Sequence, residues 1–390
     1  MKYWRGYLAA AILGAITWVL IQMGQRFTNL VDMVYPYVTR SVQTFLTAWT
    51  GGFPFLVWQT AVVFLLIVLV ATLVLVFIFR ARVIRWLGWA LAAAAAVVLL
   101  HTGLYGLNQY SGPIEDDLRM AMNDYTQADL EAATIFYRDK ANELAPLIRN
   151  ADGSYATSDF DTLAALTGDG FRKLARERSF SIYGGDYTPV KKLGWSGLYT
   201  AQGKTGITVP LTGESAVNPD IPGYALPFAM AHEMAHRLCI ARDNDADFSA
   251  FLSCTENDNL EYQYSGYFMA FRICRSALLN LDEAAVDAID AGVSTQLQED
   301  LDDLGKFFEE NRDEDLTRLV TTVTDTYEEA TADTRDRYSS TCDYLVNWHI
   351  DQYVVEEVIE EKFDPFDETQ VDLSGLPNYE VPAAEEEPAE

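Results

Sequence analysis

The sequence predicts a mainly α protein of the α+β type, with three N-terminal transmembrane helices followed by one folded domain that holds a small sheet. Long apolar runs of spanning length occur within the first 108 residues. The later residues have apolar positions at helical spacing, interrupted over 182–220 by Gly, Pro and short β-type runs. We therefore divide the chain into an anchor (1–108), a domain (109–363) and a disordered acidic tail (364–390), where Pro and Glu accumulate.

Charge divides the chain at the same point. The protein has a net charge of −29, but residues 1–108 hold seven Lys or Arg and one acid, which leaves −35 for residues 109–390. So acidic a domain argues against nucleic acid as a partner, because phosphate contacts need Lys and Arg. Four cysteines without a CxxC motif argue against a disulfide-dense framework and a thiolate zinc site, and leave room for one bridge: Cys239, Cys254, Cys274 and Cys342.

The apolar runs cover residues 7–23, 55–79 and 86–105, and each is long enough to cross the hydrocarbon core of a bilayer. The first run lacks an A-x-A-like cleavage site and two further runs follow it, so we interpret it as a retained anchor rather than a signal peptide. The lipid bilayer is therefore an expected partner. His101, near the end of the third run, is expected to pack between helices or lie at the interface.

The distribution of basic residues predicts the orientation. Two of them precede the first span and three lie in the tight turn between the second and third spans, whereas the longer loop expected at 24–52 holds two. The positive-inside rule then places the N-terminus in the cytoplasm, and three spans export the domain. We expect a multi-pass plasma-membrane protein with an extracytoplasmic domain, on the basis of Lys2, Arg5, Arg80, Arg82 and Arg85.

Within the domain, we expect amphipathic helices at 129–149 and at 159–177, the second interrupted near Gly168 and Gly170. Short strands are expected at 197–200 and 206–211, and Pro210 suits an edge strand. An exposed edge can pair with an extended peptide through main-chain hydrogen bonds, although a plain connecting hairpin is the alternative. The residues expected to hold substrate are Gly206, Ile207, Thr208 and Val209.

Residues 232–236 read His-Glu-Met-Ala-His, an HExxH motif. Positions i and i+4 lie on one helix face, so His232 and His236 can bind one ion, and Zn²⁺ commonly takes such ligands. Glu233 projects near the same edge, where it can accept a proton from water. The chain has four histidines, and the apolar residues before the motif indicate a buried helix. The alternative is a surface helix with two incidental histidines.

A catalytic zinc normally has three protein ligands. Asp243 follows the motif after a short turn and is our first candidate, with Asp247, at i+4, orienting a ligating histidine from behind. Asp245 is the second candidate ligand and Glu261 the third. Alternatively, these acids merely favour the first turn of a new helix through its dipole.

Other polar residues have weaker claims to a role. Tyr264 or Tyr267 could donate to a developing oxyanion, although an aromatic residue in a helix is more often part of the core. His349 is expected to be structural. The acidic amphipathic helices expected over 281–360 cover the core.

Residues 189–272 also carry a family resemblance. Gly206 to Glu214 fits Gly-Ile-x-x-Pro-x-Thr-Gly-Glu, and it is followed by Pro227-Phe228, the HExxH helix and Tyr264-Ser265-Gly266. This order resembles an uncharacterised bacterial family of three-span membrane proteins with a zincin-like HExxH domain, catalogued as a domain of unknown function. The resemblance implies a zincin-like metallopeptidase domain and a gluzincin-like third ligand. Matched residue by residue, that ligand is Asp243 and the residue behind the histidine is Asp247.

Three positions depart from the family's pattern. Cys239 stands where the family has a turn glycine, and Asp243 and Asp245 stand where it has glutamates. Asp is one methylene shorter, so the backbone must come closer to the metal, and Cys lacks the freedom of Gly at positive φ. These departures raise the alternative of a catalytically weak or inactive receptor or scaffold.

Taken together, the residues predict a membrane-anchored, zinc-dependent metallohydrolase, an endopeptidase by first choice, whose partner is a peptide or protein substrate. Glu233 would be the catalytic base, and His232, His236 and Asp243 would bind the metal. A transport component is a rival, but ion pathways need charged residues within the spans, and these spans have charges only at their edges.

Overall fold

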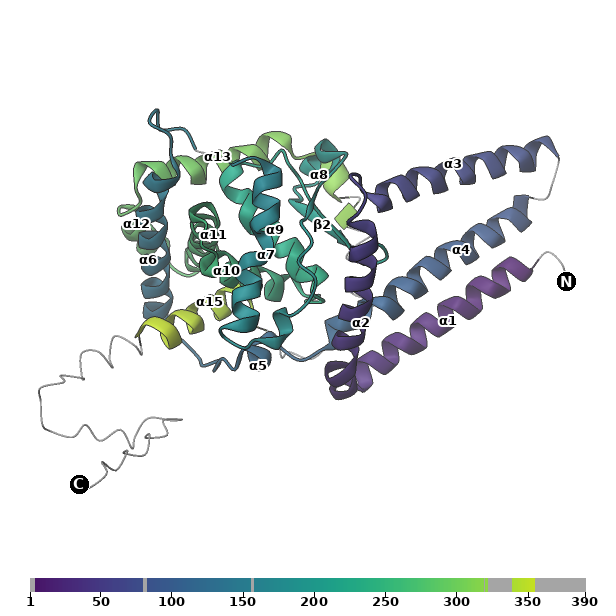
Figure 1. The fold of residues 1–390 in the computed structure, drawn as a ribbon, viewed down its shortest axis with the longest axis horizontal. Coiled ribbons are helices and arrows are strands. Elements are labelled where there is room, and N and C mark those ends of the chain that lie inside the picture. Colours follow the sequence, from purple (N-terminus) through teal and green to yellow (C-terminus); the bar gives the residue numbers. More distant parts are fainter. Residues whose placement is uncertain (1–3, 80–82, 156–157, 319, 322–338, 355–390) are drawn as a thin grey trace, which may run out of the picture.

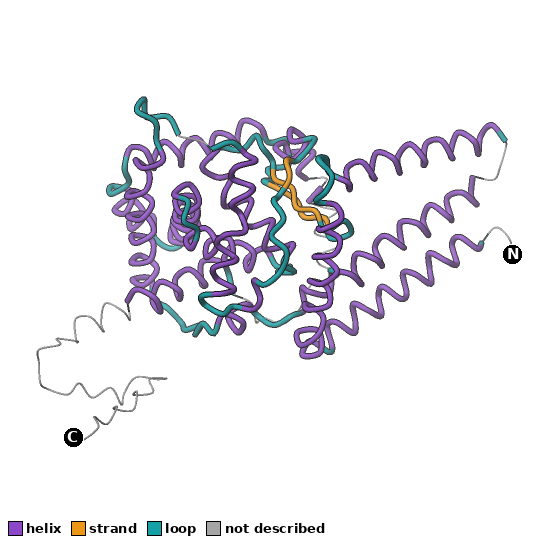
Figure 2. Tube along the Cα trace, viewed as in Figure 1, coloured by secondary structure: helices purple, strands orange, loops and turns teal. Residues whose placement is uncertain are grey.

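The computed structural model describes residues 4–79, 83–155, 158–318, 320–321 and 339–354. The expected acidic tail, two arginines of the predicted Arg-rich turn and part of the predicted C-terminal helices lie outside these ranges. Helices dominate the described residues, and one small sheet accompanies them (Figure 2). The mainly α prediction is therefore confirmed.

Three of the helices are long and apolar enough to cross a membrane: α1 (Arg5–Arg26), α3 (Val57–Ile78) and α4 (Val83–Leu104). They extend together from one side of the folded domain (Figure 1). Three apolar helices of spanning length are thus confirmed where the spans were predicted, while the crossing of a membrane and the sidedness stay predictions. The segment between the first two spans was expected to be a loop, but it forms the 23-residue helix α2 (Thr28–Thr50).

The domain packs its helices around an aromatic core. Tyr137, Phe171, Phe248 and Phe268 are fully buried in it. Helix α9 lies in the middle, in contact with α7, α10, α11 and strand β3 (Figure 1). The helices of the domain are α5 (Ile114–Leu118), α6 (Gln127–Leu144), α7 (Phe160–Arg176), α8 (Ser196–Ala201), α9 (Leu226–Arg237), α10 (Asp243–Glu256), α11 (Leu260–Leu279), α12 (Glu283–Asp290), α13 (Thr295–Asn311) and α15 (Thr341–His349), with short 3₁₀ turns at Gly106–Tyr110, Ala145–Ile148, Ser181–Tyr183 and Gly223–Ala225 and a π turn at Ile350–Val354.

Helix α7 is continuous, so the expected interruption at its glycines is wrong. A Cβ at Gly170 would overlap the carbonyl of Ser253 in α10. A Cβ at Gly168 would lie 2.5 Å from Cβ of Tyr187. These glycines therefore allow close approach between elements, and tertiary packing outweighs their poor helix propensity.

The sheet has the strand order β1-β3-β2, with β1 (Lys191–Lys192) parallel and β2 (Gly206–Val209) antiparallel to the central β3 (Glu214–Val217). Strand β2 therefore lies at an edge, as predicted. The strand expected at 197–200 is wrong, because this stretch forms helix α8. A four-residue apolar run is compatible with either state, and contact with α13 favours the helix here.

The four cysteines are all buried free thiols, so the one possible bridge is not formed. Cys239 has φ +73°. In the turn after α9, a cysteine thus adopts the left-handed backbone conformation that a glycine would adopt easily.

Candidate metal centre and edge strand

Helix α9 presents both histidines of the HExxH motif on one face. Pro227 stands in its first turn, where a missing N–H costs nothing, and Cys239 reverses the chain just after its C-terminal end. Helix α10 therefore begins at Asp243 and packs back against α9. This reversal brings acids of α10 to the histidines of α9.

Each histidine is oriented through its Nδ1 atom. His232 Nδ1 lies 2.7 Å from Oδ1 of Asp247, and His236 Nδ1 lies 2.8 Å from the carbonyl of Ile240. Because these partners accept hydrogen bonds, both Nδ1 atoms donate, and the Nε2 atoms are left to face each other. The Nε2 atoms are 3.0 Å apart, so they can share a proton or bind one cation.

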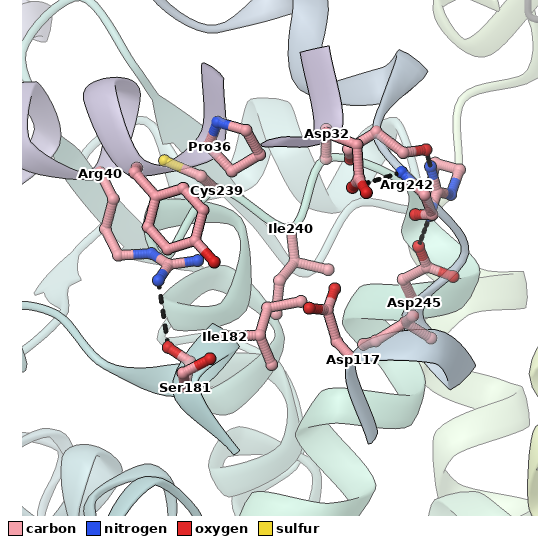
Figure 3. Close-up of a pocket in the computed structure, with 15 residues that line it drawn as sticks. Asp32, Pro36, Arg40, Asp117, Ser181, Ile182, Cys239, Ile240, Arg242 and Asp245 are labelled. Atoms are coloured by element: carbon pink, nitrogen blue, oxygen red, sulfur yellow. Dashed lines mark hydrogen bonds and ion pairs between the residues drawn. The ribbon is translucent and has the colours of Figure 1, made fainter. Parts of the chain in front are cut away.

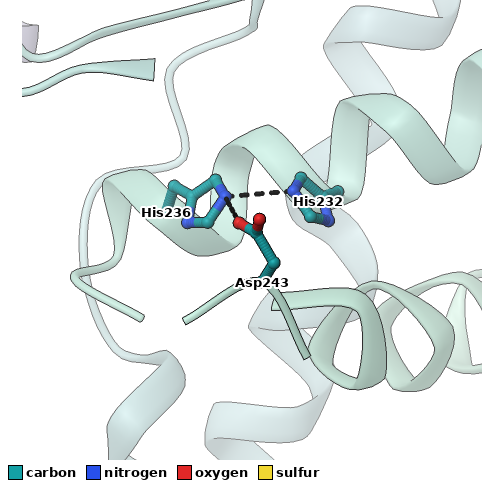
Figure 4. Close-up of side chains that lie close together, drawn as sticks. All are labelled: His232, His236 and Asp243. Carbon is teal, nitrogen blue, oxygen red and sulfur yellow. Dashed lines mark hydrogen bonds and ion pairs between the residues drawn. The ribbon is translucent and has the colours of Figure 1, made fainter. Parts of the chain in front are cut away.

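Asp243 completes the cluster. Its Oδ1 lies 3.3 Å from Nε2 of His236, and the three ligand atoms all lie within 4.8 Å of one another (Figure 4). Two ligands bound at 2.0–2.1 Å to a tetrahedral zinc are roughly 3.3 Å apart. The separations of 3.0 and 3.3 Å match this spacing, so His232, His236 and Asp243 are placed to hold a single divalent ion.

The electrostatics of the cluster favour a cation. Burial disfavours the charged form of His232, but the hydrogen bond and charge of Asp247 outweigh it and raise the pKa of His232 to about 9. The hydrogen bond to His236 lowers the pKa of Asp243 to about 2 despite its partial desolvation. The carboxylate of Asp243 is thus anionic at neutral pH, and His232 holds an extra proton that a metal ion would displace on binding.

Asp245, the alternative ligand, lies elsewhere. Its side chain is 4% exposed, forms an ion pair with Arg242 and accepts a hydrogen bond of 3.0 Å from the Tyr344 hydroxyl. Since α10 turns about 100° per residue, Asp245 points away from the face shared by Asp243 and Asp247. It stabilises the start of the helix instead.

The other candidates are also engaged outside the cluster. Glu261 accepts hydrogen bonds from the Ser158 N–H at 3.1 Å and the Tyr155 hydroxyl at 3.2 Å. The Tyr264 hydroxyl is bonded to Asp300, and Tyr267 packs among aromatic rings of the core. These contacts engage all three side chains away from the two histidines, so they do not favour an oxyanion role for either tyrosine. His349 also packs in the core, against Phe136, as expected.

Strand β2 lies against the motif's glutamate. The Thr208 hydroxyl is 2.7 Å from Oε2 of Glu233 and 2.8 Å from the Glu233 carbonyl, which also accepts from the Ser215 hydroxyl at 2.8 Å. A Cβ at Gly206 would lie 2.6 Å from Cγ of Glu233. The Thr208 side chain thus holds Glu233, and pairing of the Thr208 backbone with substrate stays a prediction. The contact of Thr208 with Glu233 could have been predicted from the sequence, because Thr208 and Gly206 lie on the same face of one strand. No pattern in the sequence predicts the contact of Ser215.

The other edge of β2 offers backbone groups. The Asn218 N–H donates to the Thr205 carbonyl at 2.8 Å, which makes this pair a hydrogen-bonded one. Such pairs alternate along an antiparallel ladder. The N–H and C=O groups of Gly206 and Thr208 therefore face away from β3, along the open edge next to Glu233.

The anchor contacts the same region. Tyr105 donates from its hydroxyl to the carbonyl of His236 at 2.8 Å, and Thr47 of α2 donates to the Gly213 carbonyl in the β2–β3 turn at 2.8 Å. A pocket lies where α2 meets the turn after α9 (Figure 3). Desolvation and the nearby Asp32 raise the pKa of Asp117 in this pocket to about 6. The sequence gave no sign of these contacts, because the partners are far apart in the chain. The labelled lining residues are Asp32, Pro36, Arg40, Asp117, Ser181, Ile182, Cys239, Ile240, Arg242 and Asp245.

Comparison with known proteins places the chain in a family without assigning a reaction. A search of curated proteins found no match, and a search of solved structures found none. A family model described as "Protein of unknown function (DUF3810)" matches residues 31–346, which include most of α2, two of the three candidate spans and the whole candidate metal centre. The chain therefore belongs to this family of proteins of unknown function.

Proposed function

We propose that this protein is a membrane-anchored, zinc-dependent endopeptidase with a zincin-like domain on the outer side of the plasma membrane. The observation that carries the proposal is the convergence of His232 Nε2, His236 Nε2 and an Asp243 oxygen. The Nδ1 atoms of both imidazoles face hydrogen-bond acceptors, so the Nε2 atoms are the ones that a metal would take, in exchange for the extra proton on His232. The orientation rests on the basic residues that flank the spans.

The chemistry of the donor set fits zinc. Two imidazole nitrogens and one carboxylate oxygen are a common catalytic zinc set, which leaves a fourth position for water or substrate. Zinc bound there would lower the pKa of a water molecule towards 7 and polarise the carbonyl of the scissile bond. Asp247 and the carbonyl of Ile240 would keep the two rings in place during the reaction.

Glu233 is the proposed general base. Its carboxylate is buried beside β2, and Thr208 fixes one oxygen by a hydrogen bond. It would take a proton from the attacking water and pass it to the leaving amine. The small Gly206 leaves the room in which this carboxylate lies.

The open edge of β2 is the proposed substrate site. An extended peptide laid antiparallel to β2 would pair with the backbone groups of Gly206 and Thr208. Main-chain hydrogen bonds do not depend on the substrate's side chains, but they require an extended backbone with free N–H and C=O groups. This edge would therefore favour extended, unfolded segments over folded substrates. The scissile carbonyl would then lie close to Glu233, since β2 and α9 are in direct contact.

The test is peptide cleavage by the full-length protein in detergent micelles with zinc, followed by mass spectrometry of a peptide library. Glu233→Gln should keep the metal and lose about 10²–10⁴-fold in cleavage rate, the usual contribution of a general base. Glu256→Gln is the matched control, because Glu256 pairs with Arg178 near the surface, at the far end of α10. Its rate should equal that of the unmodified protein. Cleavage by Glu233→Gln at the unmodified rate, or no cleavage of any peptide by the zinc-loaded protein, would refute the proposed endopeptidase.

A further inference from the structure

Helix α2 has the reverse of the usual amphipathic pattern. The residues that it buries against the rest of the protein are largely polar: Thr28, Val31, Thr39, Gln43, Thr47 and Thr50. Its exposed large side chains are apolar, and the most exposed of them, Phe45, has 71% of its surface open. They lie on one side of the helix, where the exposed Ser41 and Ala48 stand among them, and we call them the apolar stripe: Leu30, Met33, Val34, Tyr37, Val38, Phe45 and Trp49.

Neither charged residue of α2 interrupts this stripe. Oδ1 of Asp32 accepts the Gly112 N–H at 2.8 Å, and Arg40 donates to the carbonyls of Leu238 at 3.2 Å and Ser181 at 3.1 Å. Both side chains therefore turn towards the domain. A large, mainly apolar exposed face without charge is a marker of contact with a partner or a membrane.

The position of α2 decides which of these it meets. A single residue, Phe27, separates it from α1, and six residues separate it from α3. In Figure 1 it runs across the domain-side ends of α1, α3 and α4 rather than alongside them. Where the spans leave the hydrocarbon core, a helix that crosses their ends lies at the level of the lipid headgroups.

We infer that α2 is an interfacial helix, which lies in the plane of the bilayer with its apolar stripe in the boundary between headgroups and acyl chains. Its 23 residues extend about 35 Å along the surface. Tyr37 and Trp49 on the stripe are of the types enriched at this depth. Interfacial helices usually turn a charged face to water, but the polar face of α2 is covered by the domain, which explains its threonines and glutamine.

This placement fixes the edge strand relative to the lipid surface. The Gln43 amide donates to the Pro210 carbonyl at 3.0 Å, and the Thr47 hydroxyl donates to the Gly213 carbonyl. Helix α2 is therefore hydrogen-bonded to both ends of the β2–β3 turn. Arg40 holds the turn after α9 in the same way. The helix thus sets the candidate site at the membrane surface, whichever reaction the site performs.

The test is lipid photolabelling of the full chain in nanodiscs. The bilayer would contain phosphatidylcholine with a diazirine on its acyl chain, and adducts would be mapped by mass spectrometry after irradiation. We expect adducts on the α2 stripe, as on Leu65 of α3, and none on Leu281, which is 66% exposed on the domain but lies between α11 and α12. An unlabelled stripe beside a labelled α3 would overturn the inference, including the case in which a second copy of the chain covers α2.

A pair of variants gives a second readout. Phe45→Glu places a charge in the stripe and should reduce the adducts on α2, whereas Leu281→Glu should leave them unchanged. Both positions are exposed, so neither change disturbs the core. Equal labelling of α2 in the two variants would contradict its contact with lipid.

Discussion

Asp243 and Asp245 are two positions apart, but their substitution by Asn should change different properties. Asp245→Asn should lower stability, and Asp243→Asn should weaken metal binding. Asp245→Asn removes the negative charge of the buried ion pair with Arg242. Such a loss costs about 3–5 kcal/mol, and we expect about 3 because Asn can still accept the hydrogen bond from Tyr344. For a domain of this size that lowers the Tm by about 6–12 °C.

Asp243→Asn should leave stability nearly unchanged and weaken metal binding. The side chain of Asp243 is largely exposed, so the cost to stability should stay under about 1 kcal/mol, mostly from the lost negative charge in the first turn of α10. The loss of a charged ligand should exceed the 10–100-fold loss of affinity that is typical when only an outer partner of a ligand is removed.

Two assays separate these effects. Thermal unfolding of the chelator-treated variants measures stability, and competition with a zinc indicator measures affinity. We expect Asp245→Asn to bind zinc like the unmodified protein at a temperature at which it is folded. The assignment is wrong if Asp245→Asn loses zinc while Asp243→Asn keeps it.

Two further substitutions test the surroundings of the site. Gly206→Ala should displace the Glu233 carboxylate and slow peptide cleavage, whereas Gly197→Ala, where a Cβ meets no atom within 4 Å, should not; equal rates would contradict the contact between β2 and Glu233. Asp117 has a pKa of about 6 in the folded protein and a lower one when unfolded, so the folded state binds more protons between about pH 4 and 6 and the free energy of unfolding falls as the pH rises through this window. Asp117→Asn removes this pH-dependent loss of stability. At pH 7 we expect the free energy of unfolding of the variant to exceed that of the unmodified protein by about 1 kcal/mol after allowance for solvent screening, and this difference should vanish near pH 4. Urea unfolding at pH 4 and 7 measures it, and a gap that does not change with pH would refute it.

Local patterns explain what could be predicted from the sequence. The spans follow from run length, and the facing histidines follow from i, i+4 spacing on one helix. Asp243 and Asp247 could be chosen as candidate partners of the histidines because they follow the motif after a short turn and share one helix face. Cys239 adopts the left-handed conformation in this turn, although it is not a glycine. The edge position of β2 followed from Pro210.

What the sequence did not predict depends on contacts between distant residues. Helix α2 looked like a loop because its polar residues turn inwards to hold the domain, against the usual pattern. The Gly168 and Gly170 positions looked like breaks, but they fit neighbouring elements closely. Tyr264 looked available for catalysis until its hydroxyl was found bonded to Asp300, which is 36 residues away in the chain. Such pairings have no signature within a single segment.

Metal analysis of the purified full-length protein tests the central claim most directly. The account predicts one zinc per chain in the unmodified protein, and little or none in His232→Ala and His236→Ala. His349→Phe is the matched control, because this histidine lies in the aromatic core and should be dispensable for metal binding. A protein that binds no zinc, or one that keeps it after the loss of His232, would contradict the account.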